Sequence, residues 1–69
     1  MNPLFQNIRV GRHYVLVNYG EKTEFQVLRK LSENNFLAKN TLTWEKFELA
    51  SLVEFGVGKD FYFYEVEKG

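Results

Sequence analysis

The chain has 69 residues, enough for one small domain that buries only about 60% of the surface its unfolded form exposes. It contains no cysteine, which excludes disulfide bonds and thiolate zinc sites as sources of stability, whereas 17% of its residues are aromatic. Nine basic and nine acidic side chains give a net charge of zero, so the basic excess typical of nucleic-acid binders is absent. We therefore expect a single domain over residues 1–69 with an aromatic core.

The N-terminal segment, residues 1–8, is expected to be either a docked helical turn or a disordered start. Asn2 is a favourable helix cap and Pro3 suits the first helical position, but so short a helix is stable only when it packs on something else. The segment does not have the pattern of a signal peptide, and no apolar run in the chain approaches the roughly 20 residues that cross a bilayer. We expect a soluble, cytoplasmic protein with no membrane association.

Two strands joined by a short turn are predicted over residues 11–31. The run at residues 14–17 is aromatic and β-branched on both sides of a strand, which is typical of a strand covered on both faces. Gly20 in the following turn can adopt positive φ. The second strand covers residues 24–31, so the two strands form an antiparallel hairpin.

A third strand is predicted over residues 36–39 and a fourth over residues 44–49, followed by a helical turn at residues 50–55. A single helix over residues 43–56 is the alternative. At 100° per residue, however, its apolar side chains spread around the whole circumference, which disfavours a helix. Short connections between these strands fit a meander of neighbouring strands.

The last predicted strand contains four consecutive aromatic residues, 61–64. Alternation along a strand places Phe61 and Phe63 on one face and Tyr62 and Tyr64 on the other. We expect the phenylalanines to face the core. The opposite orientation stays open, because Glu65 shares the phenylalanine face. The predicted core consists of Phe25, Val27, Phe47, Leu49, Phe61 and Phe63, joined by Val15 and Val17.

The order of the elements in residues 11–39 and 47–66 resembles the Src-homology-3-like barrels, the Tudor-like members among them. The similarity is one of layout and involves no family-specific motif. It implies an all-β, five-stranded antiparallel small barrel with one or two short helical turns. An oligonucleotide-binding-type barrel of similar strand count is the alternative fold.

Few residues are suited to catalysis or to metal binding. His13 is the only histidine, and acid–base catalysis, nucleophilic catalysis and histidine-based zinc sites each need a second positioned group. Carboxylates recur close together, but at positions where solvent-exposed strand charges are expected. These pairs are Glu45 with Glu48 and Glu65 with Glu67. We predict a protein that is not an enzyme and that uses no metal or cofactor.

Three binding functions are considered for the surplus of aromatic residues. The favoured one is a non-catalytic interaction module that binds a protein partner or a second copy through its exposed aromatic strand face. The first alternative is single-stranded nucleic-acid binding, in which Tyr62 and Tyr64 stack on bases. Its phosphate contacts are assigned to Arg9, Arg12, Arg29 and Lys30. The Tudor-like resemblance implies the other alternative, an aromatic cage for a methylated cation. Its candidate residues, chosen by type, are Tyr19, Trp44, Asp60, Tyr62 and Tyr64.

Overall fold

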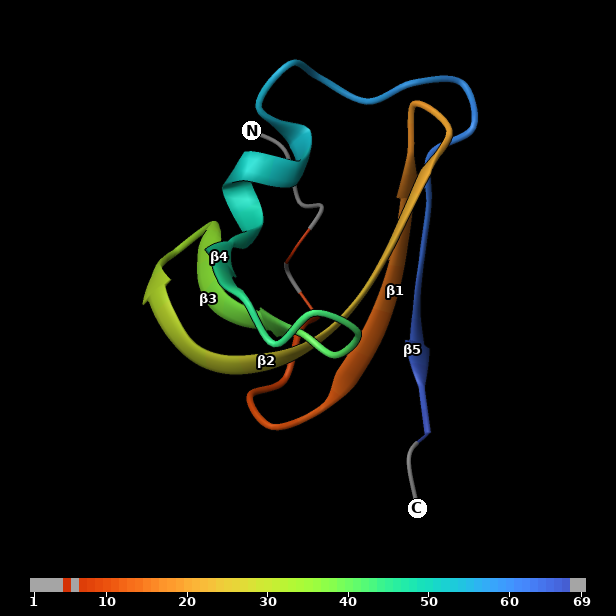
Figure 1. Cartoon of the computed structure of the whole chain (residues 1–69). Helices are drawn as coiled ribbons and strands as arrows, with labels where there is room; N and C mark the ends of the chain where they lie inside the picture. The colour runs from red at the N-terminus through yellow and green to blue at the C-terminus, as the bar shows by residue number, and fades with distance from the viewer. Residues whose placement is uncertain (1–4, 6, 68–69) are drawn as a thin grey trace.

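The computed structural model describes residues 5 and 7–67, which form one antiparallel sheet of five strands and one short 3₁₀ helix (Figure 1). The elements in chain order are β1 (His13–Asn18), β2 (Glu21–Ser32), β3 (Asn35–Asn40), β4 (Lys46–Glu48), the 3₁₀ helix η1 (Leu49–Val53) and β5 (Tyr62–Val66). The strands lie in the order β4-β3-β2-β1-β5, so the last strand pairs with the first. The prediction of an all-β fold with five antiparallel strands and a short helical turn is confirmed.

The sheet is curved and open. β2 is the longest strand, and its bend turns the β3–β4 half of the sheet away from the β1–β5 half (Figure 1). Its pairing with β3 shifts register between Val27 and Arg29 and again between Lys30 and Ser32, and such bulges bend a strand and increase its twist. No ladder joins β4 to β5 among the described strands. The predicted closure into a barrel is therefore not confirmed.

Residues 43–56 form a strand followed by a helical turn, as predicted, but β4 is shorter than expected. Trp44 precedes β4 in a turn, with a positive φ of 68°. Asn40 holds this turn, because its side-chain Oδ1 accepts hydrogen bonds from the backbone N–H groups of Leu42 and Thr43 (2.8 and 3.1 Å). The prediction that Trp44 belongs to the fourth strand is wrong, since this local side-chain bonding favours a turn over a strand.

The core lies on the inner face of the curved sheet. Phe25, Val27 and Leu49 are buried, as predicted, whereas Phe47, Phe61 and Phe63 are partly buried against them. The rings of Tyr14, Phe25 and Phe63, from β1, β2 and β5, stack with interplanar angles of 11–27°. Stacked rings of this kind contribute beyond their buried area. They join the neighbouring strands β2, β1 and β5 into one packed layer.

The face of β1 that packs on the core is the opposite of the predicted one. Tyr14 lies directly opposite Phe25 of β2, and Leu16 lies directly opposite Phe63 of β5, so these two side chains face the core. Val15 and Val17 consequently face the outer side of the sheet. Val15 is nevertheless buried, as predicted, whereas the prediction that Val17 joins the core is wrong. Residues 14–17 are apolar on both faces and give no alternation from which to read the register.

The N-terminal part of the chain contributes Phe5 to the core. This side chain is buried, and its ring lies edge-on to Phe63 with centroids 5.8 Å apart. Ile8 packs against the same cluster. These two residues thus pack on the core, while the proposed cap Asn2 and first helical residue Pro3 lie outside the described residues.

Candidate functional site

Tyr62 and Tyr64 project from the outer face of β5. They are 61% and 38% exposed, and their ring centroids are 5.0 Å apart with a tilt of 45°. Phe61 and Phe63 on the same strand pack against the core. The orientation favoured from the sequence is thus confirmed, and the tyrosines are the exposed pair.

Two valines of β1 lie beside these tyrosines. Val17 is directly opposite Tyr62, and Val15 is directly opposite Tyr64. Directly opposed residues of antiparallel strands have Cβ atoms about 4.5–5.5 Å apart and pack on the same face. Val15 is buried although it faces outward, as expected for a residue flanked by paired strands on both sides. We call the four residues Val15, Val17, Tyr62 and Tyr64 the tyrosine patch.

β5 is also an edge strand. It pairs with β1 on one side, and no described strand pairs with its other side. Backbone N–H and C=O groups on an unpaired edge can form a ladder with a further strand. The only described ion pair of β5 joins Glu65 to Arg12, with 3.0 Å between Oε2 and Nε, and both side chains are partly exposed. The tyrosine patch therefore borders a row of backbone groups that a further strand can pair with.

Tyr19 and Asp60 connect the β1–β2 turn to the loop before β5. The Asp60 carboxylate accepts hydrogen bonds from the backbone N–H groups of Tyr19 and Gly20 (3.0 and 2.7 Å). The Tyr19 hydroxyl donates to the carbonyl oxygen of Phe55 (3.2 Å). Tyr19 and Gly20 have φ values of 51° and 79°, the positive pair that a type I′ turn requires. Both side chains therefore hold the end of the sheet together.

Asn18 is the buried polar residue at the same end of the sheet, with only 6% of its surface exposed. Its Nδ2 donates to the carbonyl oxygens of Leu52 and Gly56 (both 3.1 Å), and its Oδ1 accepts from the N–H of Gly58 (2.7 Å). We call Asn18, Tyr19 and Asp60 the turn–loop clamp, since they tie β1 to the segment that leads into β5. Asn18 was not predicted as a buried residue, because an asparagine before Tyr-Gly has the ordinary signature of a turn.

Trp44 lies far from the tyrosine patch in the order of strands. It precedes β4, and β3, β2 and β1 separate that edge from β5. The indole is 70% exposed, and Nζ of Lys39 lies 4.6 Å from its ring centroid, within the range of a cation–π contact. Among the described residues, no ring contact joins Trp44 or Tyr19 to Tyr62 or Tyr64. The proposed cage residues thus occupy three separate places.

The four basic residues considered for nucleic-acid binding lie on two parts of the chain. Arg9 and Arg12 precede β1, and Arg12 is paired with Glu65. Arg29 and Lys30 lie in the part of β2 that pairs with β3, where Lys30 Nζ is 3.9 Å from a Glu33 carboxylate oxygen. Among the described residues, Arg12 is thus the one of these four whose side chain forms an ion pair with β5.

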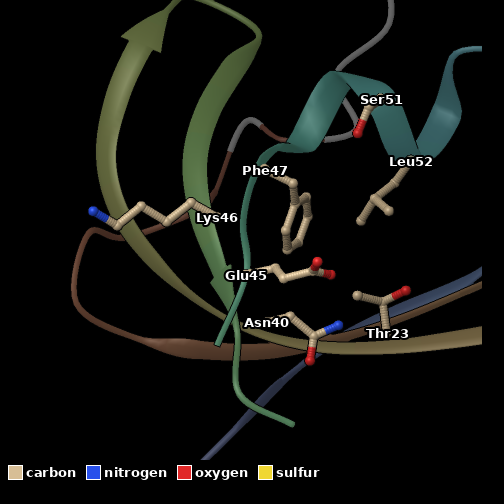
Figure 2. A pocket seen from close by; sticks show the side chains of 7 residues that line it. All are labelled: Thr23, Asn40, Glu45, Lys46, Phe47, Ser51 and Leu52. Carbon is tan, nitrogen blue, oxygen red and sulfur yellow. The ribbon is translucent and has the colours of Figure 1, made fainter. Parts of the chain in front are cut away.

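A groove of about 510 Å³ lies between β2, β4 and η1 (Figure 2). Its lining residues are Thr23, Asn40, Glu45, Lys46, Phe47, Ser51 and Leu52. The Phe47 ring and the Leu52 side chain provide its apolar wall, Glu45 provides its only carboxylate, and the Lys46 side chain extends away from it in Figure 2. No histidine or second carboxylate belongs to the lining, so the described groove does not contain an acid–base pair. No sequence pattern predicted this groove.

His13 lies on the outer face of β1, directly opposite Gln26 and Val66. Its Nδ1 atom is buried and has no hydrogen-bond partner among the described residues. Neither cross-strand neighbour is a carboxylate that would orient the imidazole. No cluster of three or more histidine, cysteine, aspartate or glutamate residues in the described ranges is arranged to hold a metal ion. No helix of the described residues is long and apolar enough to span a membrane.

Two pairs of predicted binding residues are brought together by the fold. Tyr62 contacts Tyr64 on the outer face of β5, and Tyr19 bonds to Asp60 in the turn–loop clamp, while Trp44 stands apart. Comparison of the chain with models of protein families, with curated proteins and with solved structures found no match. Function is therefore inferred from the geometry of these residues.

Proposed function

We propose that this protein is a small non-catalytic interaction module that binds a protein partner or a second copy of itself through β5. The observation that carries the proposal is the pair of adjacent, exposed tyrosines on a strand whose second edge pairs with no described strand. Tyrosine is enriched in interface cores because its ring is apolar while its hydroxyl can hydrogen-bond. A free edge adds main-chain hydrogen bonds to an extended partner. The two features together favour recognition by strand addition.

We also propose that the fold is related to the Src-homology-3-like small barrels, the Tudor-like members among them. Support comes from the strand order β4-β3-β2-β1-β5, the bent β2, and the 3₁₀ helix between β4 and β5. Such a relationship concerns architecture. It does not by itself select a ligand, because one small fold can carry many functions.

The two alternative functions receive less support from the positions of their residues. Nucleic-acid binding would benefit from free basic groups beside the tyrosine patch, but Arg12 is paired with Glu65 and the chain has no net positive charge. A methylated-cation cage requires aromatic rings to converge, and Trp44 lies near the opposite edge of the sheet from β5. Both alternatives remain predictions with their own experimental signatures.

The proposal is tested with Tyr62→Ser/Tyr64→Ser, using Phe55→Ser as the matched control. Phe55 is an aromatic residue outside β5 that is 86% exposed, so its loss changes exposed aromatic area without changing the strand. Thermal unfolding verifies that each variant folds. Sedimentation then measures self-association, and calorimetry measures binding to a purified partner obtained by affinity capture.

We expect the double tyrosine substitution to weaken one of these interactions at least about tenfold, the effect of losing about 1.4 kcal/mol of binding free energy. Phe55→Ser should leave the interaction within about twofold of the wild type. Binding that survives the tyrosine substitutions, or that is lost equally in the control, would contradict the proposal. Tyrosine-dependent retention on an oligonucleotide column that falls steeply with salt would select nucleic-acid binding instead.

A further inference from the structure

We propose that β5 pairs with β5 of a second copy, antiparallel, about a two-fold axis at Phe63. This inference rests on the proposed function and specifies its partner. The other edge of the sheet is a weaker candidate, because β4 has three residues whereas β5 has five. A two-fold axis through β5 also produces a closed dimer, in which the same surface of each copy is used.

Pairing about Phe63 places aromatic residues of β5 opposite one another. Phe63 faces Phe63 of the second copy on the inner side. Tyr62 faces Tyr64 of the second copy on the outer side, and symmetry repeats this contact. Each pair of neighbouring tyrosines, with centroids 5.0 Å apart within one copy, thus continues into a row of four rings across the dimer. Aromatic cross-strand pairs of this kind stabilise antiparallel sheets.

The same register is complementary in charge. Lys59 precedes β5 and Glu67 follows it, and both are exposed. With the axis at Phe63, the turn that carries Lys59 lies at the same end of the shared strand pair as Glu67 of the second copy, and symmetry repeats this arrangement at the other end. Opposite charges at each end of the strand pair favour this arrangement. The formal net charge of zero adds no overall repulsion between two copies.

Neighbouring registers are less favourable. An axis at Tyr64 places Tyr64 opposite its own copy but leaves Tyr62 opposite Val66. An axis at Tyr62 leaves Tyr64 opposite Asp60, whose carboxylate is already bonded to the backbone of the β1–β2 turn. Of the three registers, the Phe63-centred one alone sets both tyrosines of each copy opposite tyrosines of the other.

Disulfide trapping distinguishes these registers, because the native chain has no cysteine and only introduced thiols can react. We would prepare Tyr62→Cys and Tyr64→Cys separately, and oxidise each alone and the two as an equal mixture. Directly opposed positions lie close enough for a disulfide, whereas diagonal positions are roughly 7–8 Å apart. Phe55→Cys serves as the control for random collision, since Phe55 is exposed and lies outside β5.

A Phe63-centred dimer predicts that the mixture forms mainly the mixed disulfide between positions 62 and 64. Each variant alone should then form no more covalent dimer than the Phe55→Cys control. Efficient dimerisation of Tyr64→Cys alone would overturn the register in favour of an axis at Tyr64, and that of Tyr62→Cys alone in favour of an axis at Tyr62. Yields equal to the control in all three reactions would overturn self-pairing.

Charge reversal provides an independent measurement of the same register. Lys59→Glu and Glu67→Lys should each weaken dimerisation, by about fivefold given the modest strength of exposed ion pairs. The combined Lys59→Glu/Glu67→Lys protein should recover wild-type dimerisation, because the pairs are restored with opposite sign. Failure of the combined variant to recover would contradict the register.

Failure of self-pairing and failure of the proposed function give different results. If no thiol pair is trapped, but Tyr62→Ser/Tyr64→Ser still abolishes binding of a purified heterologous partner, self-pairing is overturned and the interaction module stands. If neither self-association nor partner binding depends on the tyrosines, both proposals are overturned. Trapping of the mixed disulfide supports both.

Discussion

Replacement of Asn18 by alanine should destabilise the protein more than any other single loss of a polar side chain in the clamp. The substitution removes three hydrogen bonds, to Leu52, Gly56 and Gly58, from a site that is almost fully buried. A net contribution of about 1 kcal/mol for each bond gives a loss of about 2–3 kcal/mol, since water can reach part of the loop. A chain of this length is typically stable by about 3–10 kcal/mol, so the loss is a large fraction of the total.

Thermal unfolding followed by circular dichroism measures this effect, and a loss of that size should lower Tm by about 10–20 °C. Asn35→Ala is the matched control, because its two side-chain hydrogen bonds are exposed to solvent and their loss should cost less than about 1 kcal/mol. Asn18→Asp should be at least as harmful as alanine at neutral pH, since its carboxylate would face two carbonyl oxygens. An Asn18→Asp protein as stable as the wild type would refute this account of the clamp.

Two further substitutions test the positions of aromatic residues. Gly58→Ala should lower the free energy of unfolding by about 1–2 kcal/mol. The added Cβ would lie 2.8 Å from Cδ1 of Tyr19 and must displace that ring from the clamp. Urea denaturation measures this change, and a variant as stable as the wild type would contradict this packing. Trp44→Ser should cost less than about 1 kcal/mol, since the indole is exposed and its described side-chain contact is the one with Lys39. It should also leave self-association within about twofold, and a tenfold loss would instead place Trp44 in the binding surface.

The five strands and the first hairpin were accessible from the sequence because local signals agreed with the fold. Gly20 marked the first turn, and it does adopt positive φ. Alternation identified Phe25 and Val27 as core residues of β2. Where alternation was missing, at residues 14–17, the orientation of the strand was mispredicted. The opening between β4 and β5 depends on the long-range bend of β2, which no local pattern reports.

The exposed tyrosines of the candidate site were predictable, whereas its supporting contacts were not. Alternation alone separated Tyr62 and Tyr64 from the phenylalanines. The hydrogen bonds of Asn18 and Asp60 join residues 34–41 positions apart, so their partners could not be inferred from neighbouring residues. The same holds for Trp44, whose residue type suited a cage but whose position was set by the Asn40 turn.

Hydrogen–deuterium exchange of the β5 amides tests the central claim most directly, because it reports on the free edge itself. We predict that amides in residues 62–66 become protected as wild-type protein is concentrated, or when its purified partner is added. Under the same conditions this protection should be absent in Tyr62→Ser/Tyr64→Ser and retained in Phe55→Ser. Exchange in β5 that is unchanged in both conditions, with new protection at β4 or in the groove instead, would contradict the assignment of β5 as the binding edge.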